Sequence, residues 1–151
     1  MIVKLMSEMT LAFCFAEGEN ARRDNEKKIR DFLSGHGLDP EATKRYFFRI
    51  SVTHGDHKHV THMRYALVPE GTTGTREVAV VHLPAGEYLS LSISKKDYED
   101  EANAADEKIS QAAKTWLAEN NKRFDMKNVI GLIEEDFVDG YEMYNLYFPI
   151  K

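Results

Sequence analysis

A chain of 151 residues with 42% hydrophobic and 30% charged residues is large enough to bury a core of its own and too apolar to be intrinsically disordered. Its 25 acidic and 20 basic residues give a formal net charge of −5. Because direct nucleic-acid binding depends on clustered lysines and arginines that neutralise phosphates, this charge argues against a DNA- or RNA-binding protein.

The first half of the chain predicts the order strand, helix, strand, strand. Residues 11–18 (LAFCFAEG) are an aromatic-rich apolar run that ends in a glycine, which is typical of a short strand. Residues 19–37 are rich in helix formers, and two closely spaced glycines end the predicted helix. Residues 44–55 and 59–71 then alternate as two strands do, and the alternation places Tyr65 with the core residues.

The second half repeats this order after a Gly/Thr-rich turn at residues 71–77. Two strand segments are interrupted at Pro84-Ala85-Gly86, a long helix carries Trp116 on its apolar stripe, and an Asp-Gly turn joins the last two strands. These segments lie, in chain order, at residues 78–94, 95–123, 128–137 and 141–151.

Two β-α-β-β units can join their strands into an antiparallel sheet that has both helices on one face. The other face, being curved, can then form a groove for a ligand. We therefore expect an α+β fold in a single domain, residues 1–151, whose pseudo-repeats cover about residues 10–70 and 76–151.

A series of motifs follows in order along the second half: Pro84-Ala85-Gly86, Trp116 with Asn120 and Asn121, Glu134, and the closing Tyr147-Phe148-Pro149-Ile150. In these motifs, from about Val78 to Lys151, the sequence resembles the GyrI-like family, also called the AraC-type effector-binding domain. Over the first half only the order of the elements is similar.

The resemblance implies a groove that binds small molecules, often hydrophobic cations, in a domain that usually follows a DNA-binding helix-turn-helix module. The first predicted strand begins near Leu11, which leaves no room before it for such a module. We therefore expect a stand-alone, non-enzymatic domain with a regulatory or sequestering role, which needs no cofactor and contacts neither nucleic acid nor membrane. The family also suggests two alternatives, a module that binds a protein partner and a hydrolase.

The resemblance favours Glu134 as the carboxylate of the groove. Glu134 and Glu135 must point to opposite faces of their strand, and a partly buried carboxylate beside aromatic faces can hold a hydrophobic cation. A hydrolase would use the same Glu134 as a general base. No Gly-x-Ser-x-Gly elbow or phosphate-binding loop indicates another catalytic class.

Alternation divides the last strand into two sets of side chains. The more apolar set suits packing under the helices and comprises Tyr144, Leu146, Phe148 and Ile150. The other set suits the groove and comprises Tyr141, Met143, Asn145 and Tyr147. Asn145 stands where many family members carry a second acidic residue. His82 alternates with Val80 and is a further candidate for the groove, or else a structural side chain.

The stretch THGDHKHVTH, residues 53–62, contains four of the six histidines and lies between two predicted strands. His57 and His59 have the spacing that puts two imidazoles on one strand face, and His54 or His62 could add a third metal ligand. A hairpin tip, however, offers no neighbouring groups to orient the rings, and the spacing matches no closed zinc motif. We expect a solvated hairpin tip without a metal, with His57 and His59 as weak candidates.

Cys14 is the single cysteine and lies between two phenylalanines, so we expect a small buried apolar side chain rather than a reactive thiol or a disulfide. No apolar run approaches the ~20 residues that a membrane span needs. Glu8 interrupts the apolar residues near the start, which argues against a secretion signal and for a cytoplasmic protein.

Overall fold

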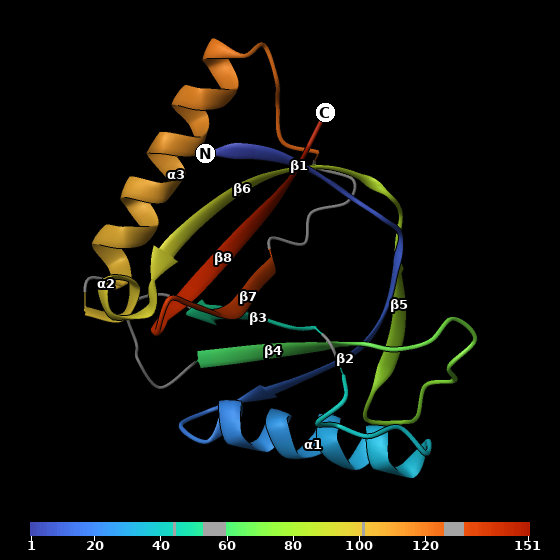
Figure 1. Ribbon diagram of the computed structural model, residues 1–151. Helices are drawn as coiled ribbons and strands as arrows, with labels where there is room; N and C mark the ends of the chain where they lie inside the picture. Colours follow the sequence, from blue (N-terminus) through green and yellow to red (C-terminus); the bar gives the residue numbers. More distant parts are fainter. Residues whose placement is uncertain (44, 53–59, 101, 126–131) are drawn as a thin grey trace. The chain divides into compact units, whose positions relative to one another are not determined.

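The computed structural model describes residues 1–43, 45–52, 60–100, 102–125 and 132–151 (Figure 1). The chain forms two compact units. We call Glu8–Pro84 the continuous unit, and Met1–Ser7 together with Ala85–Lys151 the split unit. Each unit combines a helix with antiparallel strands, so the predicted α+β class is confirmed.

Among its described residues, the continuous unit has four antiparallel strands and one helix. Its strands follow the order β3-β4-β2-β5, so that β2 and β4 are the inner strands. The elements are β2 (Met9–Glu17), α1 (Ala21–Gly35), β3 (Tyr46–Val52), β4 (Val60–Leu67) and β5 (Ala79–Leu83).

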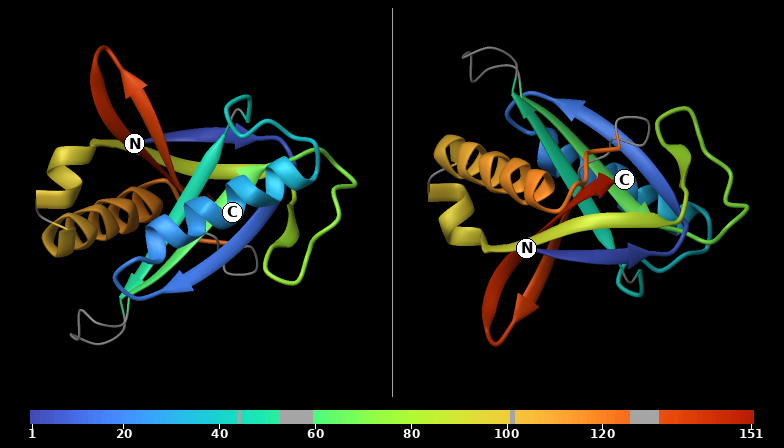
Figure 2. Two further views of the ribbon diagram at one scale, coloured as in Figure 1. Left: turned by 90° about the horizontal axis from the view of Figure 1, so that it is seen from below. Right: turned by 90° about the horizontal axis from the view of Figure 1, so that it is seen from above.

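Helix α1 covers one face of the continuous unit's sheet, along β2 and β4 (Figure 2). Its residues Ile29, Phe32 and Leu33 recur at helical spacing and are buried. They pack against β2 and β4 through Ala12 and Cys14 among others. Cys14 is thus buried, as predicted, and burial raises the pKa of its thiol to about 11. The thiol is therefore protonated at neutral pH.

Tyr65 is buried as expected, but on the other face of this sheet. Its ring stacks on Phe13 with 4.9 Å between the ring centroids, and Phe47 is its register partner in β3. Ala66, the next residue in β4, belongs to the cluster under α1. Because neighbours in a strand point to opposite faces, Tyr65 points away from α1. Alternation predicts which residues share a face, but not which face a helix covers.

In the part of the split unit that the structure describes there are four antiparallel strands and two helices. Its strands follow the order β1-β6-β8-β7, with β6 and β8 inside. Strand β1 was not predicted, and the segment 95–123, which was predicted to contain a long helix, has the short helix α2 before the long helix α3. The elements are β1 (Ile2–Met6), β6 (Gly86–Ser94), α2 (Lys95–Asp100), α3 (Ala102–Glu119), β7 (Leu132–Val138) and β8 (Tyr141–Ile150).

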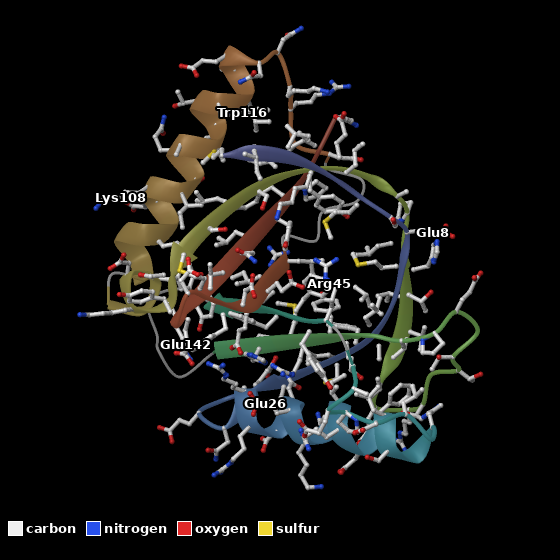
Figure 3. All side chains as sticks on the ribbon, viewed as in Figure 1. Glu8, Glu26, Arg45, Lys108, Trp116 and Glu142 are labelled. Atoms are coloured by element: carbon white, nitrogen blue, oxygen red, sulfur yellow. The ribbon has the colours of Figure 1, made fainter. Side chains whose placement is uncertain are left out.

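Helix α3 packs on one face of the split unit's sheet. Ala113 and Leu117 of α3 form a buried cluster with Leu89 of β6 and Ile150 of β8. Trp116 is half-buried and packs against this cluster, and Figure 3 shows it on the side of α3 that faces the strands of its own unit. The sheet residues that alternate with this cluster must therefore point away from α3.

The predicted Asp-Gly turn joins β7 to β8. Asp139 and Gly140 both have positive φ, at 51° and 83°, and Val138 is paired with Tyr141 directly before and after them. Positive φ at both central residues is the requirement of the two-residue turn that matches the twist of a hairpin. The turn sets the register of β8 on β7 and hence the neighbours of each candidate residue.

Among the described residues, no helix is both long enough and apolar enough to cross a membrane.

Candidate functional site

The last two strands bring most of the candidate residues to one face of the split unit. Glu134 in β7 is the register partner of Asn145 in β8, and Leu132 is the partner of Tyr147. Directly opposed residues of an antiparallel pair point to the same side. Since Phe148 and Ile150 pack against α3, this shared face is the one that points away from α3. We call it the open-helix face, because helix α3 does not cover it.

Glu134 and Tyr147 are joined directly on the open-helix face. The hydroxyl of Tyr147 donates a hydrogen bond of 2.9 Å to Oε1 of Glu134. Hydrogen bonds to a carboxylate are shorter and stronger than those between neutral groups. The phenol therefore holds the Glu134 carboxylate in one orientation, beside an aromatic ring.

Asn145 forms the centre of a second hydrogen-bonded group on this face. The hydroxyl of Ser92 donates to Oδ1 of Asn145 at 2.6 Å, and Nδ2 of Asn145 donates to a carboxylate oxygen of Asp136 at 3.2 Å. Where the resemblance leads us to expect an acidic residue at position 145, the amide instead links a hydroxyl to a carboxylate supplied by β7. Asp136 lies two residues after Glu134, so strand alternation alone could have identified it.

Lys4 adds a positive charge to the same face. Its ammonium nitrogen lies 5.6 Å from the centroid of the Tyr147 ring, within the range of a cation–π contact. Lys4 is the register partner of Tyr88 in β6, and Tyr88 in turn is paired with Pro149 of β8. Sequence reasoning missed Lys4 because β1 itself was not predicted.

The candidate residues differ in depth. Tyr141, beside the hairpin turn, is 72% exposed, whereas Tyr147, near the other end of β8, is only 3% exposed. Met143 and Glu134 are half-buried, and Asn145 is buried. A ligand that approaches from solvent therefore has Glu134 and Met143 within reach, and Tyr147 acts from beneath through its hydrogen bond to Glu134.

His82 belongs to the continuous unit, whereas the other candidates belong to β7 and β8 of the split unit. It is paired with Thr10 of β2, and the next pair on the same face is Ala12 with Val80, which packs under α1. Residues two apart in a strand point to the same face, so His82 points to the α1 side of its sheet. Its imidazole is 53% exposed, with Nε2 at 3.5 Å from the carboxylate of Glu8. The two side chains line a cavity of about 450 Å³.

His62, considered above as a third metal ligand, is buried under α1 at 2% exposure. Nδ2 of Asn25 lies 2.9 Å from its Nδ1, and the imidazole stacks on Phe48. Oδ1 of Asn25 in turn accepts a hydrogen bond from the Cys14 thiol at 3.4 Å. Burial, reinforced by Arg64 and Arg22, lowers the pKa of His62 to about 4. His62 is therefore a neutral structural side chain at physiological pH.

The two weak metal candidates, His57 and His59, fall in the stretch 53–59, which lies outside the described residues. Within the described part of the chain, no three His, Cys, Asp or Glu side chains are grouped so that they could hold a metal ion.

The architecture of the two units defines an antiparallel α+β fold, and this fold recurs in solved structures. The C-terminal domain of EcmrR has a TM-score of 0.64 and 12% identity, over 99% of this chain and 96% of that one. A hydrolase from Listeria innocua has a TM-score of 0.61 and 10% identity, over 99% and 91%. This chain thus has the fold of the EcmrR C-terminal domain.

EcmrR in its complex with DNA has a TM-score of 0.60 and 12% identity, and the match covers 99% of this chain but 56% of that one. This chain therefore spans little more than half the length of that EcmrR chain. Comparisons of the sequence with protein-family models and with curated proteins give no match.

Proposed function

We propose that this chain is a non-enzymatic, small-molecule-binding domain of the GyrI-like type and that its ligand contacts the open-helix face of the split unit. The proposed contacts are Glu134 and Met143 at the accessible level, with Asn145 and Tyr147 beneath them and Tyr141 beside the hairpin turn. His82 is left out of this set because it points to the α1 side of its own sheet.

The observation that carries the proposal is the hydrogen bond between Tyr147 and Glu134. Small-molecule sites are mostly apolar surfaces with a few fixed polar groups that orient the ligand. Glu134 is half-buried, Tyr147 holds its carboxylate in place, and the half-buried Met143 provides apolar surface on the same face. The shared fold with the EcmrR C-terminal domain and the motifs of the GyrI-like family support the same function.

A thermal-shift screen tests the proposal, with a panel of aromatic compounds in cationic and neutral forms. A ligand at ~100 times its Kd stabilises the folded state by roughly 2.7 kcal/mol, so a hit raises the melting temperature measurably. For a hit, isothermal titration should show a roughly ten- to hundredfold weaker Kd in Glu134→Gln, because a hydrogen bond to a charged group contributes about 1.5–3 kcal/mol.

Glu135→Gln is the matched control. Glu135 is the next residue in β7 and points to the opposite face, so its substitution removes the same charge one residue away. We expect the Kd of Glu135→Gln to stay within about twofold of the wild type. Equal weakening by both substitutions would show that the ligand does not lie on the open-helix face. If no compound of the panel binds, the alternative function, a module that binds a protein partner, is favoured instead.

The Glu134–Tyr147 pair also suits the hydrolase alternative, since a carboxylate held by a phenol can act as a general base. A hydrolase from Listeria innocua shares the fold. If each hit from the screen is recovered unchanged after prolonged incubation with the protein, as judged by mass spectrometry, the non-enzymatic function stands. If the protein cleaves a hit and Glu134→Gln abolishes this cleavage, the protein is instead a hydrolase.

A further inference from the structure

Lys4 places one of the protein's own cations on the open-helix face. Its ammonium nitrogen lies 5.6 Å from the centroid of the Tyr147 ring, and the hydroxyl of the same tyrosine donates to Glu134. A positive charge, an aromatic face and a carboxylate are the three components by which proteins hold organic cations. Here the positive charge comes from a side chain of the split unit itself.

Ser90 explains how Lys4 reaches across the sheet. Ser90 of β6 is the register partner of Ile2 on one side and of Tyr147 on the other, so it lies between β1 and β8. It is a small residue and is buried. The four-carbon stem of Lys4, which starts from β1 at the level of Tyr88, can therefore pass over β6 to the tyrosine ring.

We propose that Lys4 is a specificity-determining residue that occupies the position of a cation over Tyr147 and so directs this face toward neutral ligands. This inference rests on the proposed function and names its ligand class. A cationic ligand over the ring would lie beside the Lys4 ammonium or would have to displace it, and both cost free energy. A neutral ligand avoids both costs, because it brings no second positive charge to the Tyr147 ring.

The remaining groups on this face indicate what a neutral ligand offers. Asn145, Ser92 and Glu134 supply polar atoms, and the half-buried Met143 supplies apolar surface. A molecule with an apolar body and one hydroxyl group matches both kinds of surface. The ligand class that we infer is therefore a neutral, hydroxyl-bearing aromatic or aliphatic compound.

Two probes of nearly the same shape isolate the effect of charge. They are 4-tert-butylphenol and the (4-hydroxyphenyl)trimethylammonium ion, which differ chiefly by a carbon atom in place of a quaternary nitrogen. Isothermal titration of the full chain should give a tighter Kd for the neutral phenol. In Lys4→Met the cation should bind roughly tenfold more tightly than to the wild type, and the Kd of the neutral phenol should stay within about twofold.

Three further variants show whether the charge of Lys4 causes this change. Lys4→Arg keeps a cation over the ring and should behave as the wild type, and Lys4→Gln repeats the charge removal without a sulfur near Tyr147. Lys114→Met removes an exposed lysine from α3 and should leave both Kd values within about twofold of the wild type, because α3 lies on the other face of the sheet.

The proposal is overturned if Lys4→Met strengthens binding of the cation no more than Lys114→Met does, or strengthens binding of both probes equally. The second result would mean that Lys4 only covers the ring. Either result would still leave the proposed function intact under one condition. The condition is that Glu134→Gln weakens binding of the phenol and Glu135→Gln does not. If the full panel gives no ligand for the wild type or for Lys4→Met, the proposed function fails, and the role of Lys4 fails with it.

Discussion

His62 shows how one buried side chain can make the stability of this protein depend on pH. It lies under α1 and is held by Asn25 of that helix, with Phe48 of β3 stacked on its ring. The charged groups that act on it are Arg64 of β4 and Arg22 of α1, which oppose protonation, and Glu26 of α1, which favours it. Figure 3 shows Glu26 on the side of α1 that faces the strands, where it pairs with Arg64 at 3.8 Å.

The lowered pKa of His62 predicts that the protein loses stability in mild acid. Burial, followed by the two arginines, lowers the pKa from 6.5 to about 4 in the folded state. Between these two values the unfolded chain binds a proton that the folded chain does not, so the free energy of unfolding rises with pH across this window. As pH falls from about 6.5 to 4, roughly 3 kcal/mol is lost. Urea unfolding at a series of pH values measures this slope.

His62→Gln removes the titrating group and should flatten the slope between about pH 4 and 6.5, whatever its effect on stability at neutral pH. The wild-type protein, unfolded over the same series of pH values, is the reference for this slope. A slope in His62→Gln as steep as in the wild type would contradict the prediction.

At the scale of residues, the sequence predicted the buried thiol but not its polar partners. Ala21, Ile29, Phe32 and Leu33 could be recognised as the inner face of α1 from their spacing. Asn25 lies at the same spacing and is fully buried, yet a polar side chain of this kind is typical of the solvent-exposed face of a helix. Its burial depends on His62 and Cys14, which lie on other elements, so no local pattern could reveal it.

At the scale of elements, the β7–β8 hairpin is the best predicted part of the candidate site. The Asp-Gly turn and the alternation of β8 together predict which side chains share a face, and both depend only on neighbouring residues. Strand β1 and the different pairing partners of β5 and β6 were not predictable in this way. β1 pairs with β6, and β5 pairs with β2, across long stretches of intervening chain. Lys4 was missed for the same reason.

The hairpin turn gives a prediction for stability. Gly140 has a φ of +83° and would meet no other atom if it carried a side chain, so Gly140→Ala costs only backbone strain. We expect it to lower the free energy of unfolding by about 1–2 kcal/mol. Urea unfolding midpoints should show the loss.

Gly35→Ala is the matched control for this turn. Gly35 ends α1, has no positive φ, and also has open space around it. Because alanine restricts the unfolded chain and favours a helix, this substitution should be neutral or stabilise by up to about 1 kcal/mol. If both substitutions destabilised the protein equally, the strain assigned to the turn would be wrong.

At the scale of the whole molecule, the charge leads to an expectation about DNA. The formal net charge is −5, which disfavours contact with a polyanion. We expect no binding to a fluorescent DNA duplex at physiological salt up to about 100 μM protein, as measured by anisotropy. Binding in the micromolar range that weakens steeply with added salt would contradict this prediction.

The path of the chain between the two units has a consequence for how the protein is made. It leaves the split unit at Ser7, builds the whole continuous unit, and returns at Ala85. On the ribosome, Ile2 emerges before the continuous unit, and its strand partner Ser90 emerges only after that unit has been synthesised. Ile2, Val3 and Leu5 are exposed apolar residues even in the folded strand. During translation β1 is therefore an apolar segment without its pairing strand. A chaperone or an N-terminal fusion partner would contact it before the sheet of the split unit has formed.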